Sequence, residues 1–409
     1  MDYQQENNVW VIGHKNPDTD SICAAICYAN LKNRLQDGFH YIPKRAGSIN
    51  EETKYVLQHF GVEPPEYAED AGAQVKDIAF RRTAGVSGHI SLKKAWELMK
   101  TENVMTLAVT SASDKLEGLI ITGDIAESYM DVYDNHILSR ARTQYKNIVE
   151  TLNGTLLAGN EHAYFLRGKV VVATGSRDVI EECIESDDLV IVGDRDETHI
   201  CALEENASCM VVTGGTQVSA QVLEMANRRD CVVIITPYDT FTAARLINQS
   251  MPIKYFMKKE NFVTFDIDDY VDEVREVMSK KRHRDFPVLD DQRRYLGMVS
   301  RRNLLNMHKK KLILVDHNEK SQAIDGIEGA EILEIIDHHR LGSLETMSPV
   351  FFRNQPLGCT STIVYQMYCE SGIEIEEKIA GLLLSAILSD TLMFRSPTCT
   401  KADHEAARA

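Results

Sequence analysis

The feature that most constrains the fold is a short apolar run followed by a polar loop and a longer apolar segment. Residues 9–12 are apolar, 13–21 form the polar loop, and 22–29 have the composition of a buried helix. This order of strand, loop and helix is typical of a parallel α/β sheet. The sequence predicts a second strand over 39–43 and a second helix over 51–60. Two strands cannot complete such a sheet, so the unit needs strands from elsewhere in the chain.

The missing strands are predicted near the other end of the sequence. A buried strand is predicted at 312–315 and another strand at 331–336, each ending in a polar turn, and helices are expected over about 360–371 and 376–388. Domain insertion is tolerated at exposed loops, so the simplest architecture is one α/β domain interrupted by an insert from about 70 to 309. The predicted fold class is therefore α/β, with a doubly wound and mostly parallel sheet.

Seven acidic and imidazole side chains stand at the ends of these elements, where α/β sheets bind ligands. They are His14, Asp18, Asp20, Asp316, His338, His339 and Asp390. Each has an ordinary structural explanation, because acidic residues also cap helices and Asp-His runs also suit surface turns. Together, four carboxylates at one sheet edge repel one another unless cations lie among them. Two divalent cations about 3.5–4 Å apart would form a hydrolytic centre.

The insert contains an internal repeat. Two units of roughly 60 residues, near 71–132 and 251–309, share an order of helix, strand, turn and strand. The second resembles a CBS domain, and the first is similar but weaker. Between them, Asp194-Arg195 and Thr213-Gly214-Gly215 resemble the signature of a DRTGG domain. The two glycines could form a phosphate-binding turn, but an ordinary turn is favoured because no Lys-Ser/Thr follows them.

Four motifs resemble those of family II inorganic pyrophosphatases, which belong to the DHH phosphoesterase superfamily. They are His-Lys-Asn-Pro-Asp-Thr-Asp-Ser at 14–21, Val-Asp-His-Asn-Glu at 315–319, Ile-Asp-His-His-Arg at 336–340 and Leu-Ser-Asp-Thr-Leu-Met-Phe-Arg-Ser-Pro-Thr at 388–398. The insert resembles that of the nucleotide-regulated members. The implied domains are the catalytic DHH domain at 1–70 and 310–409, CBS repeats at 71–132 and 251–309, and a DRTGG domain at 140–250.

The resemblance implies a role for each residue of the constellation. It places His14 and Asp18 on a first Mn²⁺, Asp20 and His338 on a second, and Asp316 and Asp390 on both, with His339 facing the substrate. His339, Asp316 and His338 are the implied catalytic residues. Mixed nitrogen and oxygen ligands favour Mn²⁺ or Co²⁺ over Mg²⁺, although Co²⁺ or Mg²⁺ could substitute for Mn²⁺.

The CBS resemblance implies binding of adenine nucleotides in clefts between the repeats. Candidate contacts are Thr122, Asp124, Arg294, Tyr295, Ser300, Arg301 and Asn303. Each repeat lacks one half of the family's usual ribose-binding pair, since Ile121 replaces a hydroxyl in the first and Asn303 an acidic residue in the second. The arginines are equally well explained as a solvated face.

The implied function is hydrolysis of inorganic diphosphate, regulated by AMP or ADP and by diadenosine polyphosphates, in a homodimer. Family members carry a further domain with a Ser-Arg-Lys-Lys run, which this sequence of 409 residues lacks. We therefore expect this chain to bind metal but to hydrolyse diphosphate poorly. Two alternatives are an adenine-nucleotide sensor with a vestigial phosphoesterase domain and another DHH phosphoesterase acting on small nucleotides. The latter usually have Asp-Gly-Asp where this chain has Asp18-Thr19-Asp20.

The composition of the chain limits which partners it can bind and in which cellular compartment it is expected. The net charge of −16 disfavours nucleic acid as a partner. The apolar runs are far shorter than the roughly 18–20 residues of a membrane span, so no membrane partner is expected. Nine cysteines without a Cys-x-x-Cys pair indicate a reducing compartment. With no signal-peptide features at the N-terminus, the sequence predicts a cytoplasmic protein.

Overall fold

The computed structural model describes residues 7–130, 134–175, 177–306 and 309–409. The chain forms two compact units, each described by itself. Unit 1 comprises residues 1–79, 267–283 and 301–409, and unit 2 comprises 80–266 and 284–300. No helix in the described ranges is long and apolar enough to cross a membrane. The expected domain boundaries remain predictions, and those at residues 1 and 132 lie outside the described residues.

Unit 1 is built on a six-stranded sheet in which every strand pair is parallel. The order is β18-β17-β16-β1-β2-β3, so the first strand of the chain lies between its neighbour β2 and a strand about 300 residues later. The strands are β1 (Asn8–Ile12), β2 (His40–Arg45), β3 (Glu66–Tyr67), β16 (Lys311–Val315), β17 (Glu331–Asp337) and β18 (Phe351–Asn354). The predicted α/β class with a mostly parallel sheet is confirmed.

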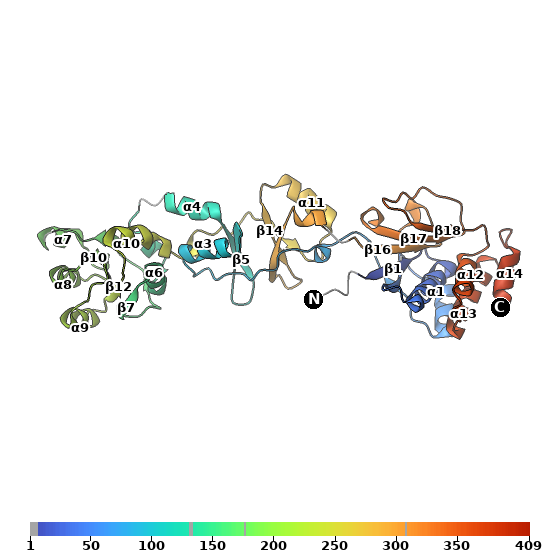
Figure 1. Ribbon diagram of the computed structural model, residues 1–409, viewed down its shortest axis with the longest axis horizontal. Coiled ribbons are helices and arrows are strands. Elements are labelled where there is room, and N and C mark those ends of the chain that lie inside the picture. The colour runs from blue at the N-terminus through green and yellow to red at the C-terminus, as the bar shows by residue number, and fades with distance from the viewer. Residues whose placement is uncertain (1–6, 131–133, 176, 307–308) are drawn as a thin grey trace. The chain divides into compact units, whose positions relative to one another are not determined.

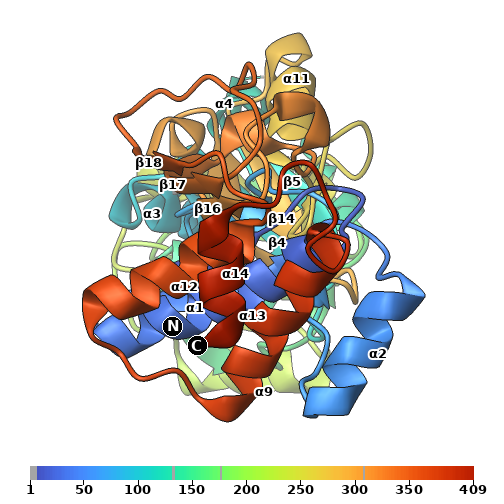
Figure 2. The same ribbon diagram turned by 90° about the vertical axis from the view of Figure 1, so that its right-hand side faces the viewer.

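One layer of helices covers a face of this sheet (Figures 1 and 2). The central helix of the layer, α1, packs against both α12 and α13, and α14 packs against the same two helices. The helices are α1 (Thr19–Leu35), α2 (Glu51–Phe60), α12 (Thr360–Ser371), α13 (Glu377–Asp390) and α14 (Lys401–Arg408). Because α1 lies between the sheet and two helices, residues 19–29 are all buried, which explains why its middle is apolar on every side.

The other face of the sheet is covered by irregular backbone rather than by long helices. Ile12 and Leu314 of the sheet pack against Ile324 and Ile327, which lie in the connection between β16 and β17. That connection contains two short 3₁₀ helices, η5 (Lys320–Gln322) and η6 (Ile327–Gly329). Unit 1 also contains η1 (Val75–Asp77), α11 (Val271–Lys280) and η4 (Asn303–Asn306).

Unit 2 contains a five-stranded sheet in the order β7-β12-β11-β10-β9, in which only β7 runs antiparallel. Its strands are β7 (Thr155–Ala158), β9 (Val170–Val172), β10 (Leu189–Val192), β11 (Cys209–Val212) and β12 (Val232–Ile235). Its helices are α6 (Tyr145–Thr151), α7 (Arg177–Cys183), α8 (Asp196–Glu204), α9 (Ala220–Arg228) and α10 (Thr240–Leu246). All residues of β10 and β11 are buried, as expected for central parallel strands.

The rest of unit 2 carries smaller sheets that correspond to the predicted repeats. They contain β4 (Thr106–Thr110), β5 (Leu116–Ile121), β13 (Phe265–Asp266), β14 (Asp285–Leu289) and β15 (Tyr295–Ser300). Both β4-β5 and β14-β15 are antiparallel hairpins, in keeping with the predicted repeat. The remaining elements are α3 (Leu92–Thr101), α4 (Thr122–Met130), η2 (Ile247–Ser250), η3 (Ile253–Tyr255), and α5 (Ile137–Arg140) with the short pair β6 (Thr143–Gln144) and β8 (Tyr164–Phe165).

Candidate metal centre

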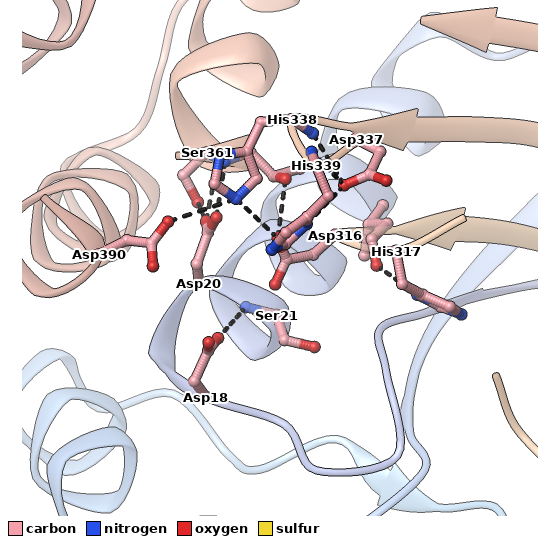
Figure 3. A network of polar contacts seen from close by, with 12 residues as sticks. Asp18, Asp20, Ser21, Asp316, His317, Asp337, His338, His339, Ser361 and Asp390 are labelled. Carbon is pink, nitrogen blue, oxygen red and sulfur yellow. Dashed lines mark hydrogen bonds and ion pairs between the residues drawn. The ribbon is translucent and has the colours of Figure 1, made fainter. Parts of the chain in front are cut away.

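The predicted constellation comes together at one edge of the sheet in unit 1 (Figure 3). The loop after β1, the ends of β16 and β17, and the end of α13 supply the side chains. Together with the Cys359 sulfur, their nitrogen and oxygen atoms form three clusters, and the ligand atoms within each cluster lie within 4.8 Å of one another. The clusters are His14 with Asp18 and Asp316, Asp316 with His338 and His339, and Asp20 with Cys359 and Asp390.

The loop after β1 serves both the helix and the cluster. Asp18 is the N-cap of α1, and its Oδ1 accepts a hydrogen bond of 2.9 Å from the Ser21 backbone N–H. Its other oxygen, Oδ2, lies 3.8 Å from Nε2 of His14. Ser21 Oγ accepts from the His14 backbone N–H at 3.1 Å, which fixes the loop between them. Capping and ligand binding are therefore compatible roles for Asp18.

Asp316 lies at the middle of the cluster, directly after β16. Its backbone adopts a left-handed φ of 64°, which Asp tolerates better than most residues. Oδ1 accepts a hydrogen bond of 2.9 Å from the Thr360 hydroxyl and lies 3.5 Å from His338 Nε2. Oδ2 lies 3.4 Å from His14 Nε2 and has no hydrogen-bond partner among the described residues, although it is buried. The two oxygens thus face different imidazoles.

His338 is held with one nitrogen toward the carboxylates. Its Nδ1 donates to the Leu357 carbonyl at 3.0 Å, so Nε2 is the nitrogen that faces the cluster. Nε2 lies 3.4 Å from Oδ2 of Asp390, a second buried oxygen without a hydrogen-bond partner in the described part of the chain. Such a carbonyl partner is typical of metal-binding histidines, because it fixes the tautomer and the ring orientation.

Asp20 is fully buried and points at the first turn of α12. Its carboxylate accepts from the backbone N–H groups of Thr360 at 2.6 Å and Ser361 at 2.9 Å, and from the Ser361 hydroxyl at 2.6 Å. A helix N-terminus stabilises a negative charge, since its first N–H groups lack partners within the helix. The start of α12 therefore orients a carboxylate that belongs to α1.

Without a cation, the charges of the cluster shift the pKa values of its members. Burial opposes protonation of His14 and His338, but nearby carboxylates outweigh it and raise the pKa of each to about 10. Burial and the charges of Asp316 and Asp390 raise the pKa of Asp20 to about 8. Burial also raises the pKa of Asp390, to about 6. The side chains thus take up protons where a cation would otherwise balance their charge.

The donor atoms fit shared cations better than they fit direct hydrogen bonds. Two atoms bound to one cation at about 2.0–2.2 Å lie about 3–3.6 Å apart. The separations from His14 to Asp316 and from His338 to Asp390 are both 3.4 Å. Two buried carboxylate oxygens have no hydrogen-bond partner in the described residues. Imidazole and carboxylate groups together suit Mn²⁺ or Co²⁺.

Two further histidines differ in orientation. His339 is half exposed, and its Nδ1 is 2.9 Å from Oδ1 of Asp337, which outweighs its burial and raises the pKa of His339. His317 is buried and turned away from the cluster, with Nδ1 donating to the Val315 carbonyl at 2.9 Å (Figure 3). His339 is thus the accessible imidazole beside Asp316, from which its Nδ1 is 3.8 Å away.

Sequence reasoning missed several residues that contact the cluster. Cys359 lies beside Asp20 and Asp390, and Ser361 donates to Asp20. Asp337 accepts from His339, and Asp403 lies behind the start of α12. The run of hydroxyl residues at 360–362 was a usable signal, because such residues favour helix N-termini.

The predicted nucleotide contacts belong to both units. Thr122 begins α4, and Ser300 ends β15. In unit 2, Asp124 is buried, and its Oδ2 accepts from the Ile121 backbone N–H at 2.8 Å. Arg294 pairs with Asp290 at 2.7 Å, and Tyr295 is buried with its hydroxyl 3.2 Å from that of Thr83. These groups already have partners within the unit.

In unit 1, Arg301 and Asn303 also have internal partners. Arg301 donates to the carbonyls of Met278, Lys281 and His283, at and just beyond the C-terminus of α11. Asn303 donates to the Ala79 carbonyl at 2.7 Å. A cation at a helix C-terminus is a common stabilising contact. The roles of all seven candidates in nucleotide binding remain predictions.

The paired glycines of the DRTGG signature make an ordinary turn. Gly214 and Gly215 have φ values of 77° and 66°, which suit glycine. Their backbone N–H groups donate to the carbonyls of Tyr238 and Thr236, both at 2.8 Å. Because both N–H groups already donate to carbonyls of the chain, they are not free to bind a phosphate, and the turn is the ordinary turn that the sequence favoured.

Comparisons with known proteins found matches to the insert and to almost the whole chain. A DRTGG domain model matches residues 147–250 and a CBS domain model matches 253–309. The cobalt-dependent inorganic pyrophosphatase of Clostridium perfringens is 43% identical over 400 residues, which are 98% of this chain and 73% of that protein. The probable manganese-dependent inorganic pyrophosphatase of Thermotoga maritima is 39% identical over 399 residues, 98% of this chain and 72% of that protein.

One solved structure resembles the insert. It contains the CBS and DRTGG domains of the regulatory region of Clostridium perfringens pyrophosphatase, complexed with its activator, diadenosine tetraphosphate. It is 36% identical, has a TM-score of 0.54, and covers 56% of this chain and all of that one. The insert thus has the architecture of a region that binds an adenine nucleotide in that protein.

Proposed function

The chain belongs to the family II inorganic pyrophosphatases, which depend on manganese or cobalt, and from this premise we propose that it hydrolyses inorganic diphosphate to two phosphates at a centre of two divalent cations. The observation that carries the proposal is the position of Asp316. Its two oxygens face His14 and His338, and one of them is buried without a hydrogen-bond partner in the described residues. A carboxylate so placed suits a bridge between two cations.

The ligand assignment is the one that the family resemblance implies, and the clusters around Asp316 support it in part, because they place His14 and Asp18 on one side of Asp316 and His338 on the other. His14 and Asp18 would hold one cation, Asp20 and His338 the other, and Asp316 and Asp390 both. When bound, two such cations lower the pKa of water and neutralise charge on a phosphate substrate. The chain's own groups provide orientation: the Leu357 carbonyl fixes His338, and the first turn of α12 fixes Asp20. His339 is accessible beside Asp316, which suits a proton-donating contact with substrate oxygen.

The direct test is release of phosphate from diphosphate by the purified chain with Mn²⁺ or Co²⁺, and with a chelator as the blank. Asp316→Asn should lose at least one of two tightly bound cations and lower the rate more than about 100-fold. Asp291→Asn, an exposed change in a turn of unit 2, serves as the matched control. Two tight cations in Asp316→Asn would contradict the bridging role. Hydrolysis of small dinucleotides but not of diphosphate would favour another phosphoesterase activity.

We further propose that adenine nucleotides bind the CBS repeats and alter the rate of hydrolysis. The proposal is supported by the activator complex of the Clostridium perfringens regulatory region, whose architecture the insert shares. Rates measured with AMP, ADP and diadenosine tetraphosphate give the sign of each effect. No effect of any of the three would contradict the proposal.

Two finer expectations remain predictions. The homodimer is tested by sedimentation of the purified chain. The expected weak hydrolysis is not supported by the comparisons, which cover almost the whole chain with pyrophosphatases. The turnover number of the chain, measured beside that of a longer relative, decides this point. An equal turnover would show that the expectation is wrong.

A further inference from the structure

A short segment of backbone, residues 357–361, contacts three of the proposed ligands. The Leu357 carbonyl accepts from His338 at 3.0 Å. The backbone N–H groups of Thr360 and Ser361 donate to Asp20 at 2.6 and 2.9 Å, and the Thr360 hydroxyl donates to Asp316 at 2.9 Å. Any displacement of this segment would therefore turn ligands of both proposed cations at once.

A single buried carboxylate holds this segment from the other side. Asp403, in the first turn of α14, is completely buried. Its Oδ2 accepts from the Gly358 backbone N–H at 3.0 Å, and its Oδ1 accepts from the Thr362 hydroxyl at 2.7 Å. These bonds join α14 to the start of α12 across more than forty residues of sequence. Hydrogen bonds to a buried carboxylate are among the stronger ones in proteins, so the link is rigid.

The packing around Gly358 leaves the segment no room to move toward α14. A Cβ atom on Gly358 would lie 2.9 Å from Oδ2 of Asp403 and 2.8 Å from the Thr391 methyl. Thr391 directly follows the proposed ligand Asp390, and it is also fully buried. The segment is thus held between the carboxylate of α14 and the end of α13.

We infer that Asp403 is a positioning residue of the metal centre, which fixes residues 357–361 and through them the orientation of Asp20, Asp316 and His338. The inference rests on the proposed cation site. Partners that orient metal ligands from outside typically contribute 10–100-fold to metal affinity. Within the described residues, the hydrogen bonds of Asp403 go to Gly358, Thr362 and Thr400 and to none of the proposed ligands, so we expect its effect to pass through the segment.

A simpler role for Asp403 is local capping of α14. The carboxylate also accepts from the Thr400 backbone N–H and from the Thr400 hydroxyl, both at 2.7 Å, and the bond from the backbone N–H is half of a capping box. The two roles use different partners, although Oδ2 serves both: Thr400 belongs to the cap, whereas Gly358 lies in the segment and Thr362 directly follows it. Variants of these partners therefore separate positioning from stability.

The test is a titration of the full chain with Co²⁺, followed by visible absorption, which reports both affinity and coordination geometry. Asp403→Ala should lower the affinity for Co²⁺ about 10–100-fold and change the spectrum. Thr400→Ala removes the cap hydroxyl and keeps the bonds from Gly358 and Thr362, so it should leave the affinity for Co²⁺ and the spectrum unchanged. Asp403→Asn should restore most of the affinity, because its amide oxygen can accept from Gly358 while its NH₂ donates to the Thr362 hydroxyl.

Each outcome separates the inference from the proposed function. If the wild-type chain binds no Co²⁺, the proposed function fails. If it binds two ions and a folded Asp403→Ala binds them with the same affinity and spectrum, only the inference fails. An equal loss in Thr400→Ala would also overturn it, because stability alone would then account for the effect. If Asp403→Ala does not fold, Thr362→Val replaces it: weaker Co²⁺ binding would support the inference, and wild-type binding would overturn it.

Discussion

At the scale of single residues, two carboxylates of the candidate centre, Asp18 and Asp316, use their two oxygens for different tasks. One oxygen of Asp18 caps α1 while the other faces His14. One oxygen of Asp316 accepts from Thr360 while the other is buried without a hydrogen-bond partner among the described residues. This division explains why sequence patterns suited both a capping role and a metal-binding role, since the two do not compete for the same atom.

Stability should depend on pH through Asp403. Burial opposes its ionisation, but bonds from Thr362 and Thr400 outweigh this and hold the pKa of Asp403 below its usual range. A carboxyl group whose pKa is lower in the folded chain stabilises it above the pKa of the unfolded chain, about 3.9. This stabilisation is lost as the pH falls through the lower, folded value.

The amide variant Asp403→Asn does not titrate and therefore isolates this effect. In urea unfolding with a chelator present, the wild-type chain should be more stable than the variant by about 1–3 kcal/mol at pH 7. The difference should shrink below about pH 4. A difference that stays constant from pH 7 to pH 3 would contradict the assignment.

Gly358 should not tolerate a side chain. Its Cβ position is occupied by Asp403 and Thr391, so Gly358→Ala forces one of them to shift and should cost about 1–3 kcal/mol. Binding of Mn²⁺ should weaken as well, because Thr391 adjoins Asp390. Gly329→Ala is the control, since the nearest atom to its Cβ lies 3.7 Å away. Calorimetry with and without Mn²⁺ measures the unfolding temperature of both variants. Equal unfolding temperatures for the two variants would show that position 358 tolerates a side chain.

At the scale of elements, α13 ends in a turn that stores backbone strain. Leu392, Met393 and Phe394 have φ values of 49°, 56° and 64°, a run of three left-handed residues without glycine. Each non-glycine residue in this region costs about 1–2 kcal/mol. The turn directly follows Asp390 and is held by the Thr391 hydroxyl, which accepts from the Phe394 backbone N–H at 3.2 Å.

Met393→Gly should therefore stabilise the chain by about 0.5–1 kcal/mol, the relief of strain less the entropy of glycine. Met393 is 58% exposed, so little packing is lost. The control Leu384→Gly, in the right-handed interior of α13, should instead cost at least about 1 kcal/mol. Chemical denaturation of the two variants measures both values, and destabilisation by Met393→Gly would show that the side chain matters more than the strain.

Elements with strong local signals were predictable from the sequence. Asn50 and Gly61 bound α2 as expected, with Asn50 Oδ1 accepting from Thr53 and Gly61 in a left-handed conformation. The strands β3 and β18 were not expected, because they are short and lie at the edges of the sheet. The link from Asp403 to Gly358 could not be predicted either, since it depends on how two helices meet rather than on any local pattern.

At the scale of the whole molecule, each unit contains one of the two tryptophans. Trp10 lies in β1 of unit 1, and Trp96 lies in α3 of unit 2. The variants Trp96→Phe and Trp10→Phe therefore report on one unit each. The effect of metal on the stability of unit 1, where the proposed centre lies, can therefore be compared with its effect on the stability of unit 2.

Removing metal should destabilise unit 1 alone. A cation present at about 100 times its Kd stabilises the fold by about 2.7 kcal/mol, or about 5–10 °C for a unit of this size. Chelation should therefore lower the midpoint followed by Trp10 and leave that followed by Trp96 in place. Equal shifts of both signals would show that the units unfold together.

Because β1 pairs with β16, about 300 residues later in the chain, the proposed ligands are synthesised at very different times. At about 5–20 residues per second, roughly 20–80 s of synthesis separate Asp18 from Asp403. Until Asp390 has been made, the three ligands that are synthesised first lack the partners that complete the proposed site. The choice of cation is therefore made only after Asp390 has been synthesised, under the metal concentrations of the surrounding compartment. Ribosome-bound chains halted with residue 390 exposed should release Co²⁺ more readily than chains halted with residue 409 exposed.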